Sequence, residues 1–261
     1  MIESFFQSLE QERVAYLLIS GQATILYGAA MFSEDIDLWV EPSVSNIEPL
    51  RRVMHAVGAT YYKLTPPLDE TTLVRGHGFH FRLPDEPEVY VDVMGQPPRV
   101  PIFSEVLPDA VEMTTAWGRI PTIGIKHLVA LKTTQRLEDY PVITQLVLRY
   151  MERTAAPDEA DFRWALDNLY TADALVEFLR AHPDASGLCG QLIPVGSDIA
   201  RQMVAGEDIE EPLRMDLERW FGERMLVRRQ SDREYWREII KELRGFRRAG
   251  MLMPVGELVR V

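Results

Sequence analysis

The chain has 261 residues and a net charge of −12, with 46% hydrophobic and 26% charged residues, which is the composition of an ordinary globular protein of one large or two packed domains. Its single cysteine, Cys189, excludes a disulfide framework and a thiolate zinc cluster. No run approaches the roughly 18 apolar residues of a membrane span, and the start, MIESFFQSLEQERV, lacks signal-peptide features, so the sequence predicts a cytoplasmic protein with no membrane partner.

The charge is unevenly distributed along the chain. Residues 213–249 contain 11 Lys and Arg against seven Asp and Glu, whereas the rest of the chain is strongly acidic. An acidic body argues against general DNA binding. The basic stretch is either a solvated helix face of mixed charge or a local contact for an anionic partner.

The first part of the sequence alternates short apolar runs with helical patterns, which predicts an α+β fold with a mixed sheet and flanking helices. The expected helices are residues 2–12, 22–31 and 45–59, and the expected strands are residues 14–20, 33–40, 77–83 and 89–94. Prolines and glycines break residues 101–124 into short strands and loops.

From residue 125 onward nearly every pattern is helical. The expected helices of this part are residues 158–169, 172–182, 197–204, 212–227 and 231–248. A soft boundary near residue 145 divides the chain into an α+β domain, 1–145, and a helical C-terminal domain, 146–261.

Three aspartates stand in runs that otherwise have the character of buried strands. In FSEDIDLWV (residues 32–40), alternation points Asp35 and Asp37 to one face, about 7 Å apart along the strand. In VYVDVM (residues 89–94), Asp92 interrupts a run of strong β-formers. If the two strands are neighbours, all three carboxylates share one open face. Such a group of oxygen ligands suits Mg²⁺, which relieves their mutual repulsion.

The junction at Ser20-Gly21 links an expected strand to an expected helix. Two small residues there let backbone N–H groups approach a phosphate closely. The chain has neither GxGxxG nor GxxxxGK[ST], so dinucleotide-binding and Walker-type sites have no support.

The order of these parts resembles the nucleotidyltransferase superfamily that includes DNA polymerase beta, and more closely its minimal bacterial branch. The matching segments are ISGQATILYG, SEDIDLWV, VDVMG and IKHLVALKTTQRLEDY, within roughly residues 14–145. The resemblance departs from the family pattern where Ser20 replaces a glycine. It departs again at Met31, near which relatives often carry a basic residue.

The resemblance implies an enzyme that moves an NMP from an NTP such as ATP to a hydroxyl and releases pyrophosphate. It implies that Asp35, Asp37 and Asp92 are catalytic and hold two Mg²⁺ ions. It further implies that the nucleotide is bound by Ser20, Gly21, Lys132 and Arg136. Because the branch contains abortive-infection and toxin–antitoxin proteins, we expect a toxin or phage-defence role with a cognate antitoxin as partner.

The acceptor of the nucleotide stays open at this point: a tRNA end, a protein side chain or a small molecule such as an antibiotic. One alternative is a non-catalytic scaffold that keeps the fold to bind a partner, which Met31 in place of a basic residue favours. Another is a metal-dependent nuclease, although the turn at Ser20-Gly21 would then have no purpose.

Overall fold

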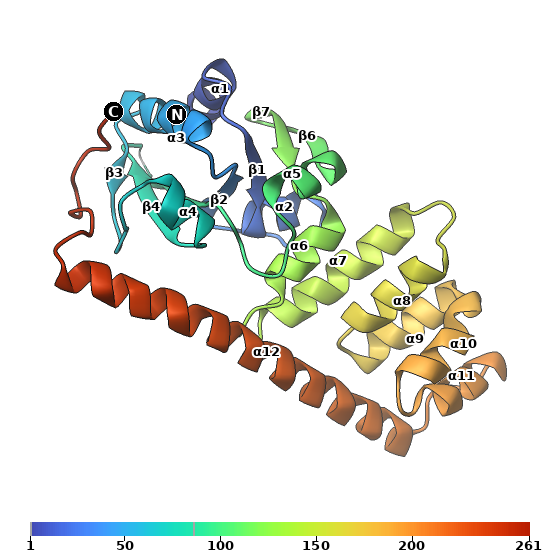
Figure 1. The fold of residues 1–261 in the computed structure, drawn as a ribbon. Coiled ribbons are helices and arrows are strands. Elements are labelled where there is room, and N and C mark those ends of the chain that lie inside the picture. The colour runs from blue at the N-terminus through green and yellow to red at the C-terminus, as the bar shows by residue number, and fades with distance from the viewer. Residues whose placement is uncertain (1, 86) are drawn as a thin grey trace. The chain divides into compact units, whose positions relative to one another are not determined.

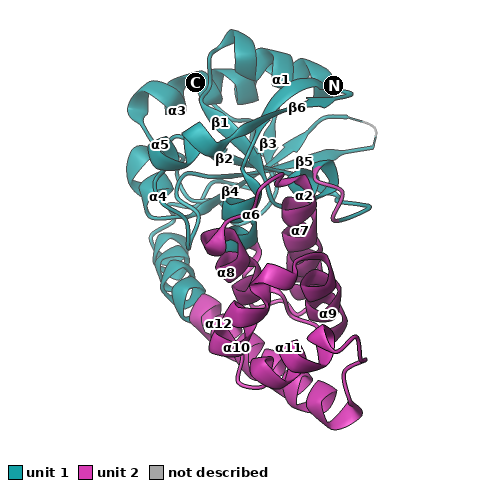
Figure 2. Cartoon of the chain, turned by 90° about the vertical axis from the view of Figure 1, so that its right-hand side faces the viewer, with its two compact units in different colours: residues 1–26, 30–131, 234–261 teal, residues 27–29, 132–233 magenta. Residues whose placement is uncertain are grey.

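The computed structural model describes residues 2–85 and 87–261 (Figure 1). The chain forms two compact units (Figure 2). The first contains the residues up to Leu26, Ala30–Leu131 and Glu234–Val261, and the second contains Tyr27–Ala29 and Lys132–Arg233. Residue 145, where the sequence suggests a boundary, lies within α7 (Asp139–Arg153) of the second unit.

A seven-stranded mixed sheet forms the centre of the first unit, as the α+β prediction requires. Its spatial order is β3-β4-β5-β2-β1-β7-β6. The β2–β5 and β1–β7 pairs are parallel, and the other neighbours are antiparallel. The strands are β1 (Tyr16–Ile19), β2 (Asp35–Val40), β3 (Thr60–Tyr61), β4 (Gly78–Leu83), β5 (Val89–Met94), β6 (Val111–Thr115) and β7 (Gly118–Thr122).

The helices of the first unit connect these strands. They are α1 (Ile2–Gln11), α2 (Ser20–Leu26), α3 (Val44–Ala56), α4 (Glu70–Val74), α5 (Phe103–Val106), the 3₁₀ turn η1 (Leu107–Asp109) and α6 (Ile125–Lys132). Helix α2 is shorter than the expected 22–31, since it ends before Gly28, which has a φ of +78°. The short elements β3 and α4 had no clear periodicity in the sequence.

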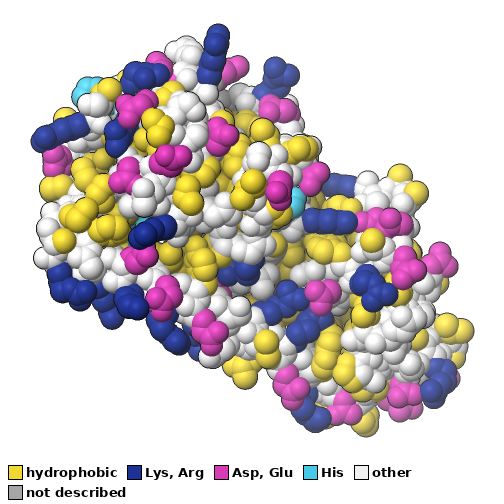
Figure 3. All heavy atoms as spheres, viewed as in Figure 1, with side chains coloured by type: hydrophobic (Ala, Val, Ile, Leu, Met, Phe, Trp, Pro, Cys, Tyr) yellow, Lys and Arg dark blue, Asp and Glu magenta, His cyan; other side chains and the backbone are white. Residues whose placement is uncertain are grey.

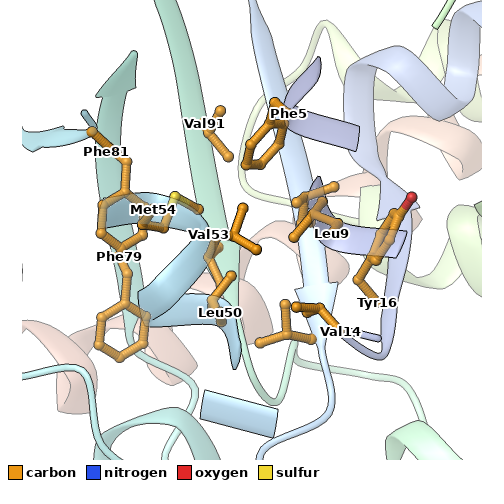
Figure 4. Close-up of a cluster of buried hydrophobic side chains, with 14 of the residues drawn as sticks. Phe5, Leu9, Val14, Tyr16, Leu50, Val53, Met54, Phe79, Phe81 and Val91 are labelled. Carbon is orange, nitrogen blue, oxygen red and sulfur yellow. The ribbon is translucent and has the colours of Figure 1, made fainter. Parts of the chain in front are cut away.

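Helices α1 and α3 bury one face of the sheet. Alternate residues of the strands point to this side, so that β4 and β5 contribute every second side chain to the core. Figure 4 shows side chains of this cluster, among them Phe5, Leu9, Val14, Tyr16, Leu50, Val53, Met54, Phe79, Phe81 and Val91. The opposite face of β2, β4 and β5 is therefore left to carry polar groups.

The second unit is helical, as predicted for the C-terminal part of the chain. Its helices are α7 (Asp139–Arg153), α8 (Glu159–Asn168), α9 (Ala172–Ala181), the 3₁₀ turn η2 (Pro183–Ala185), α10 (Ser186–Leu192), α11 (Gly196–Val204) and the first part of α12 (Glu211–Arg248). Edge-to-face aromatic pairs stabilise its packing: Phe162–Phe178 joins α8 to α9, and Tyr140 of α7 contacts Tyr170 in the segment between α8 and α9.

Helix α12 is one continuous helix of 38 residues, so the prediction of two helices, 212–227 and 231–248, is wrong. The intervening residues 228–230 are Arg, Arg and Gln, which favour helix, and no proline interrupts them. Exposed Lys and Arg side chains follow its C-terminal part, along the lower left edge of Figure 3. Neither this charged helix nor any other in the described residues is long and apolar enough to cross a membrane.

Candidate functional site

The pairing of β2 with β5 brings the predicted carboxylates together. These strands are parallel neighbours, and their register places Asp37 directly beside Asp92 and Asp35 beside Tyr90. Asp35, Asp37 and Asp92 are all partly exposed, whereas Ile36, Leu38, Val91 and Val93 between them are buried. Adjacent strands lie about 4.8 Å apart. The three carboxylates therefore share one open face of the sheet, as alternation predicts.

The electrostatics of Asp35 reflect this crowding. Partial burial and, after it, the negative charge of Asp92 raise the pKa of the Asp35 carboxyl. The charges of Lys63 and His80 act in the opposite direction on the same pKa. A carboxyl whose charged form is disfavoured by a neighbouring carboxylate gains from a nearby cation.

Asp92 has two close partners that sequence analysis did not identify. The Tyr62 hydroxyl donates a hydrogen bond of 2.9 Å to Oδ1 of Asp92. Nδ1 of His80 lies 2.9 Å from the same oxygen, at ion-pair distance, although the ring is not aligned for a hydrogen bond. His80 faces Asp92 because β4 pairs with β5 in antiparallel register. The alternation of HGFHFRL indicates the face of His80, and the turn-rich PDEPE that joins this run to VYVDVM is a signal for its partner strand, but the residue register has no signal.

The donor chemistry of Asp35 and Asp37 fits a divalent cation, since both are oxygen ligands and since burial and, after it, the charge of Asp92 raise the pKa of Asp35. Asp92 contacts the Tyr62 hydroxyl and the His80 ring. Within the described residues, no group of three or more His, Cys, Asp or Glu side chains is arranged to hold a metal ion.

The turn at Ser20-Gly21 is built tightly against the segment that precedes Asp35. Ser20 has a φ of +56°, in the left-handed region that glycine favours, and its carbonyl accepts a 2.7 Å hydrogen bond from the Thr24 hydroxyl. A Cβ on Gly21 would lie 2.1 Å from Oγ of Ser33. Gly21 is therefore required for the close approach of Ser33, which leads into β2.

The loop before β2 carries exposed apolar side chains. Met31 is 97% exposed and Phe32 is 74% exposed. This loop has no Lys or Arg near Met31, which stands near the position where the resembled family often has a basic residue.

Lys132 and Arg136 belong to another cluster, in the second unit. The Lys132 ammonium lies 3.3 Å from Oδ1 of Asp139, and Nε of Arg136 lies 3.0 Å from Oδ2 of the same residue. Lys132 is almost fully buried, whereas the Arg136 side chain is 57% exposed. Both cations thus neutralise Asp139, and their contact with a nucleotide stays a prediction.

Comparisons with known proteins add a likeness in structure. No family model matches the chain, and no curated protein matches it. A proposed nucleotidyltransferase from Thermotoga maritima is similar over 48% of this chain and 76% of its own, with 13% identity and a TM-score of 0.35. An antigenic nucleotidyltransferase-like protein from Paracoccidioides brasiliensis is similar over 71% of this chain and 88% of its own, with 14% identity and a TM-score of 0.40.

Proposed function

We propose that the chain is a nucleotidyltransferase that moves an NMP from an NTP to a hydroxyl acceptor. The observation that carries this proposal is the β2–β5 register, which sets Asp37 beside Asp92, with Asp35 two residues away on the same open face. The Ser20-Gly21 turn, packed against Ser33 just ahead of these carboxylates, supports it. Positioning and charge neutralisation supply most of the catalysis in phosphoryl transfer. Carboxylates that can hold a cation and backbone N–H groups that can approach a phosphate provide both.

In the proposed reaction the acceptor oxygen attacks the α-phosphorus, and the bond to the pyrophosphate oxygen breaks. Backbone N–H groups at Ser20 and Gly21 bind the β- and γ-phosphates, and contact of Lys132 and Arg136 with the nucleotide stays an expectation from the resemblance. Both described contacts of Asp92 use Oδ1, so Oδ2 is the atom that takes the acceptor proton. Asp35 and Asp37 would hold a divalent cation such as Mg²⁺, and Asp92 would hold a second; such ions would supply charge neutralisation for the triphosphate.

The acceptor and biological role rest on the resemblance alone. We propose a toxin or phage-defence enzyme, controlled by a cognate antitoxin, that modifies a tRNA end or a protein. An antibiotic-modifying enzyme is the alternative within the same reaction class.

The test of this function is transfer of label from α-phosphate-labelled NTPs in a cell extract. The double variant Asp35→Asn/Asp37→Asn is expected to lose transfer by roughly a thousandfold or more, since removal of one preorganised electrostatic contact already costs on the order of 10² to 10³ in rate. Glu34→Gln, which removes an exposed carboxylate next to Asp35, is the matched control and should retain transfer. Equal labelling by the double variant and the wild type would eliminate the mechanism.

A second candidate is a non-catalytic scaffold, and the engagement of Asp92 by Tyr62 and His80 favours it. A scaffold has no need of metal-dependent nucleotide binding. Calorimetric titration with Mg²⁺–ATP and then with the other NTPs separates the two functions: heat of binding that requires Mg²⁺ supports the enzyme, and no binding of any NTP supports the scaffold.

A further inference from the structure

Lys63 is a cation that lies beside the carboxylate face but was not identified from the sequence. It follows β3 and is exposed to solvent. Its ammonium nitrogen lies 4.6 Å from the centroid of the Tyr62 ring, a cation–π distance. The hydroxyl of that ring donates to Asp92. A single aromatic side chain therefore connects the lysine to the third carboxylate.

The backbone around Lys63 is held on both sides. The Lys63 carbonyl accepts a 3.1 Å hydrogen bond from the hydroxyl of Thr65, a fully buried residue, and the same hydroxyl accepts from the His80 N–H at 3.2 Å. The Tyr62 N–H donates to the His80 carbonyl at 3.2 Å. Met253, in the C-terminal segment, donates its N–H to the Thr65 carbonyl at 2.8 Å. The backbone of Lys63 is thus held by hydrogen bonds next to β4, the strand whose His80 lies opposite Asp92.

The charge of Lys63 is available to a ligand. Among the residues that the structure describes, no carboxylate lies within ion-pair distance of its ammonium group. The ammonium group therefore lies over a ring whose hydroxyl contacts Asp92, without being neutralised by an ion pair. The loop before β2, by contrast, ends in the exposed apolar residues Met31 and Phe32.

We propose that Lys63 is a phosphate-binding residue, whose ammonium group contacts the polyphosphate of a nucleotide bound at Asp35 and Asp37 and provides the cation that the loop at Met31 lacks. This inference rests on the proposed function for the position of the nucleotide. An ammonium group is a compact donor that suits a phosphate oxygen. Tyr62 is a positioning residue in this arrangement, since its ring supports the ammonium group and its hydroxyl holds Asp92.

The test is calorimetric titration of the full chain with Mg²⁺–ATP and, separately, with Mg²⁺–AMP. Lys63→Ala is expected to weaken ATP binding by about tenfold or more, the loss of one charge-assisted hydrogen bond, and to weaken AMP binding much less. Lys63→Arg should restore most of the ATP affinity. Lys241→Ala removes an exposed lysine that pairs with Glu238 in α12, and should leave ATP affinity unchanged. Circular dichroism checks that all variants are folded.

Each outcome has a definite meaning. A selective loss of ATP affinity in Lys63→Ala, with rescue by arginine, supports the inference even if no nucleotide transfer is ever detected, in which case only the proposed function fails. Unchanged ATP affinity in a folded Lys63→Ala variant overturns the inference about Lys63. If the wild type still transfers nucleotide, the proposed function stands without it. Absence of ATP binding by the wild type overturns the inference as well.

Discussion

The carboxyl of Asp35 is more easily protonated in the folded chain than in the unfolded chain. Burial and the charge of Asp92 raise its folded-state pKa above the ordinary value of 3.8. A group with a raised folded-state pKa stabilises the fold at a pH below its unfolded pKa, and this contribution is lost as the pH rises through the folded-state pKa. Asp35 therefore opposes folding at neutral pH relative to a neutral side chain.

We expect Asp35→Asn to increase the free energy of unfolding at pH 7, because it removes a carboxylate that is partly desolvated and repelled by Asp92. The gain should shrink as the pH falls through the folded-state pKa and vanish below about pH 3.8, where the wild-type side chain is protonated in both states. Urea unfolding across this range measures the effect.

Asp92→Asn supplies the corresponding control for the cause of this shift. In that background the charge that acts on Asp35 is absent, so Asp35→Asn should give a smaller gain at pH 7. A gain that is the same at pH 7 and pH 3 would contradict the electrostatic origin, and point to packing or hydrogen bonding instead.

At the scale of elements, the C-terminal segment protects the edge of the sheet. It forms bridges between Thr60 and Leu258 and between Thr65 and Met253, alongside the edge strand β3. The Val259 N–H donates to the Ala59 carbonyl at 3.0 Å, and the Val259 side chain is fully buried. An uncovered edge strand offers unpaired backbone groups to other chains. This segment therefore pairs with backbone groups at the edge of the sheet, and its Val259 side chain becomes part of the core.

We expect Val259→Ala to lower the free energy of unfolding by about 2 kcal/mol, from the loss of two buried methyl groups and the cavity that remains. Val261→Ala, at a side chain that is 67% exposed, is the matched control and should have little effect. Chemical denaturation compares the two. Equal stability of the two variants would show that the C-terminal segment does not pack as described.

The order of elements could be predicted wherever local periodicity decides the structure. The alternation in DIDLWV and VYVDVM assigned Asp35, Asp37 and Asp92 to exposed positions, because burial of the intervening aliphatic residues determines the register of each strand. Trp39, in contrast, has the same parity as Asp37 but is fully buried, with its indole N–H donating to the Gly95 carbonyl at 2.8 Å. The open face therefore ends before Trp39, which alternation alone does not indicate.

Pairings between distant segments could not be predicted from the sequence. Tyr62 meets Asp92 through β3, an element of only two residues that no local pattern indicates. Within the first unit, Nε2 of the buried His77 lies 2.9 Å from Oε2 of Glu242, 165 residues further along the chain. Such contacts depend on how the chain returns to the sheet, which is a property of the tertiary fold.

At the scale of the whole molecule, the first unit is discontinuous in sequence. Residues 234–261 belong to it although they follow the helical unit, and α12 continues from one unit into the other without a break. A continuous helix has no composition change or proline that marks a boundary, and the sequence patterns place a division near residue 145 instead. The whole chain has a net charge of −12, so a cation such as Lys63 is a local feature of the carboxylate face.

The central claim is that the whole chain transfers a nucleoside monophosphate. The most direct measurement is incubation of the purified chain and cell extract with Mg²⁺ and ATP, CTP, GTP or UTP labelled either at the α-phosphate or at the γ-phosphate. We expect an acceptor to gain the α-label from at least one NTP, while the γ-label leaves with pyrophosphate. Transfer of the γ-label, or no labelled acceptor with any of the four nucleotides, would contradict the claim.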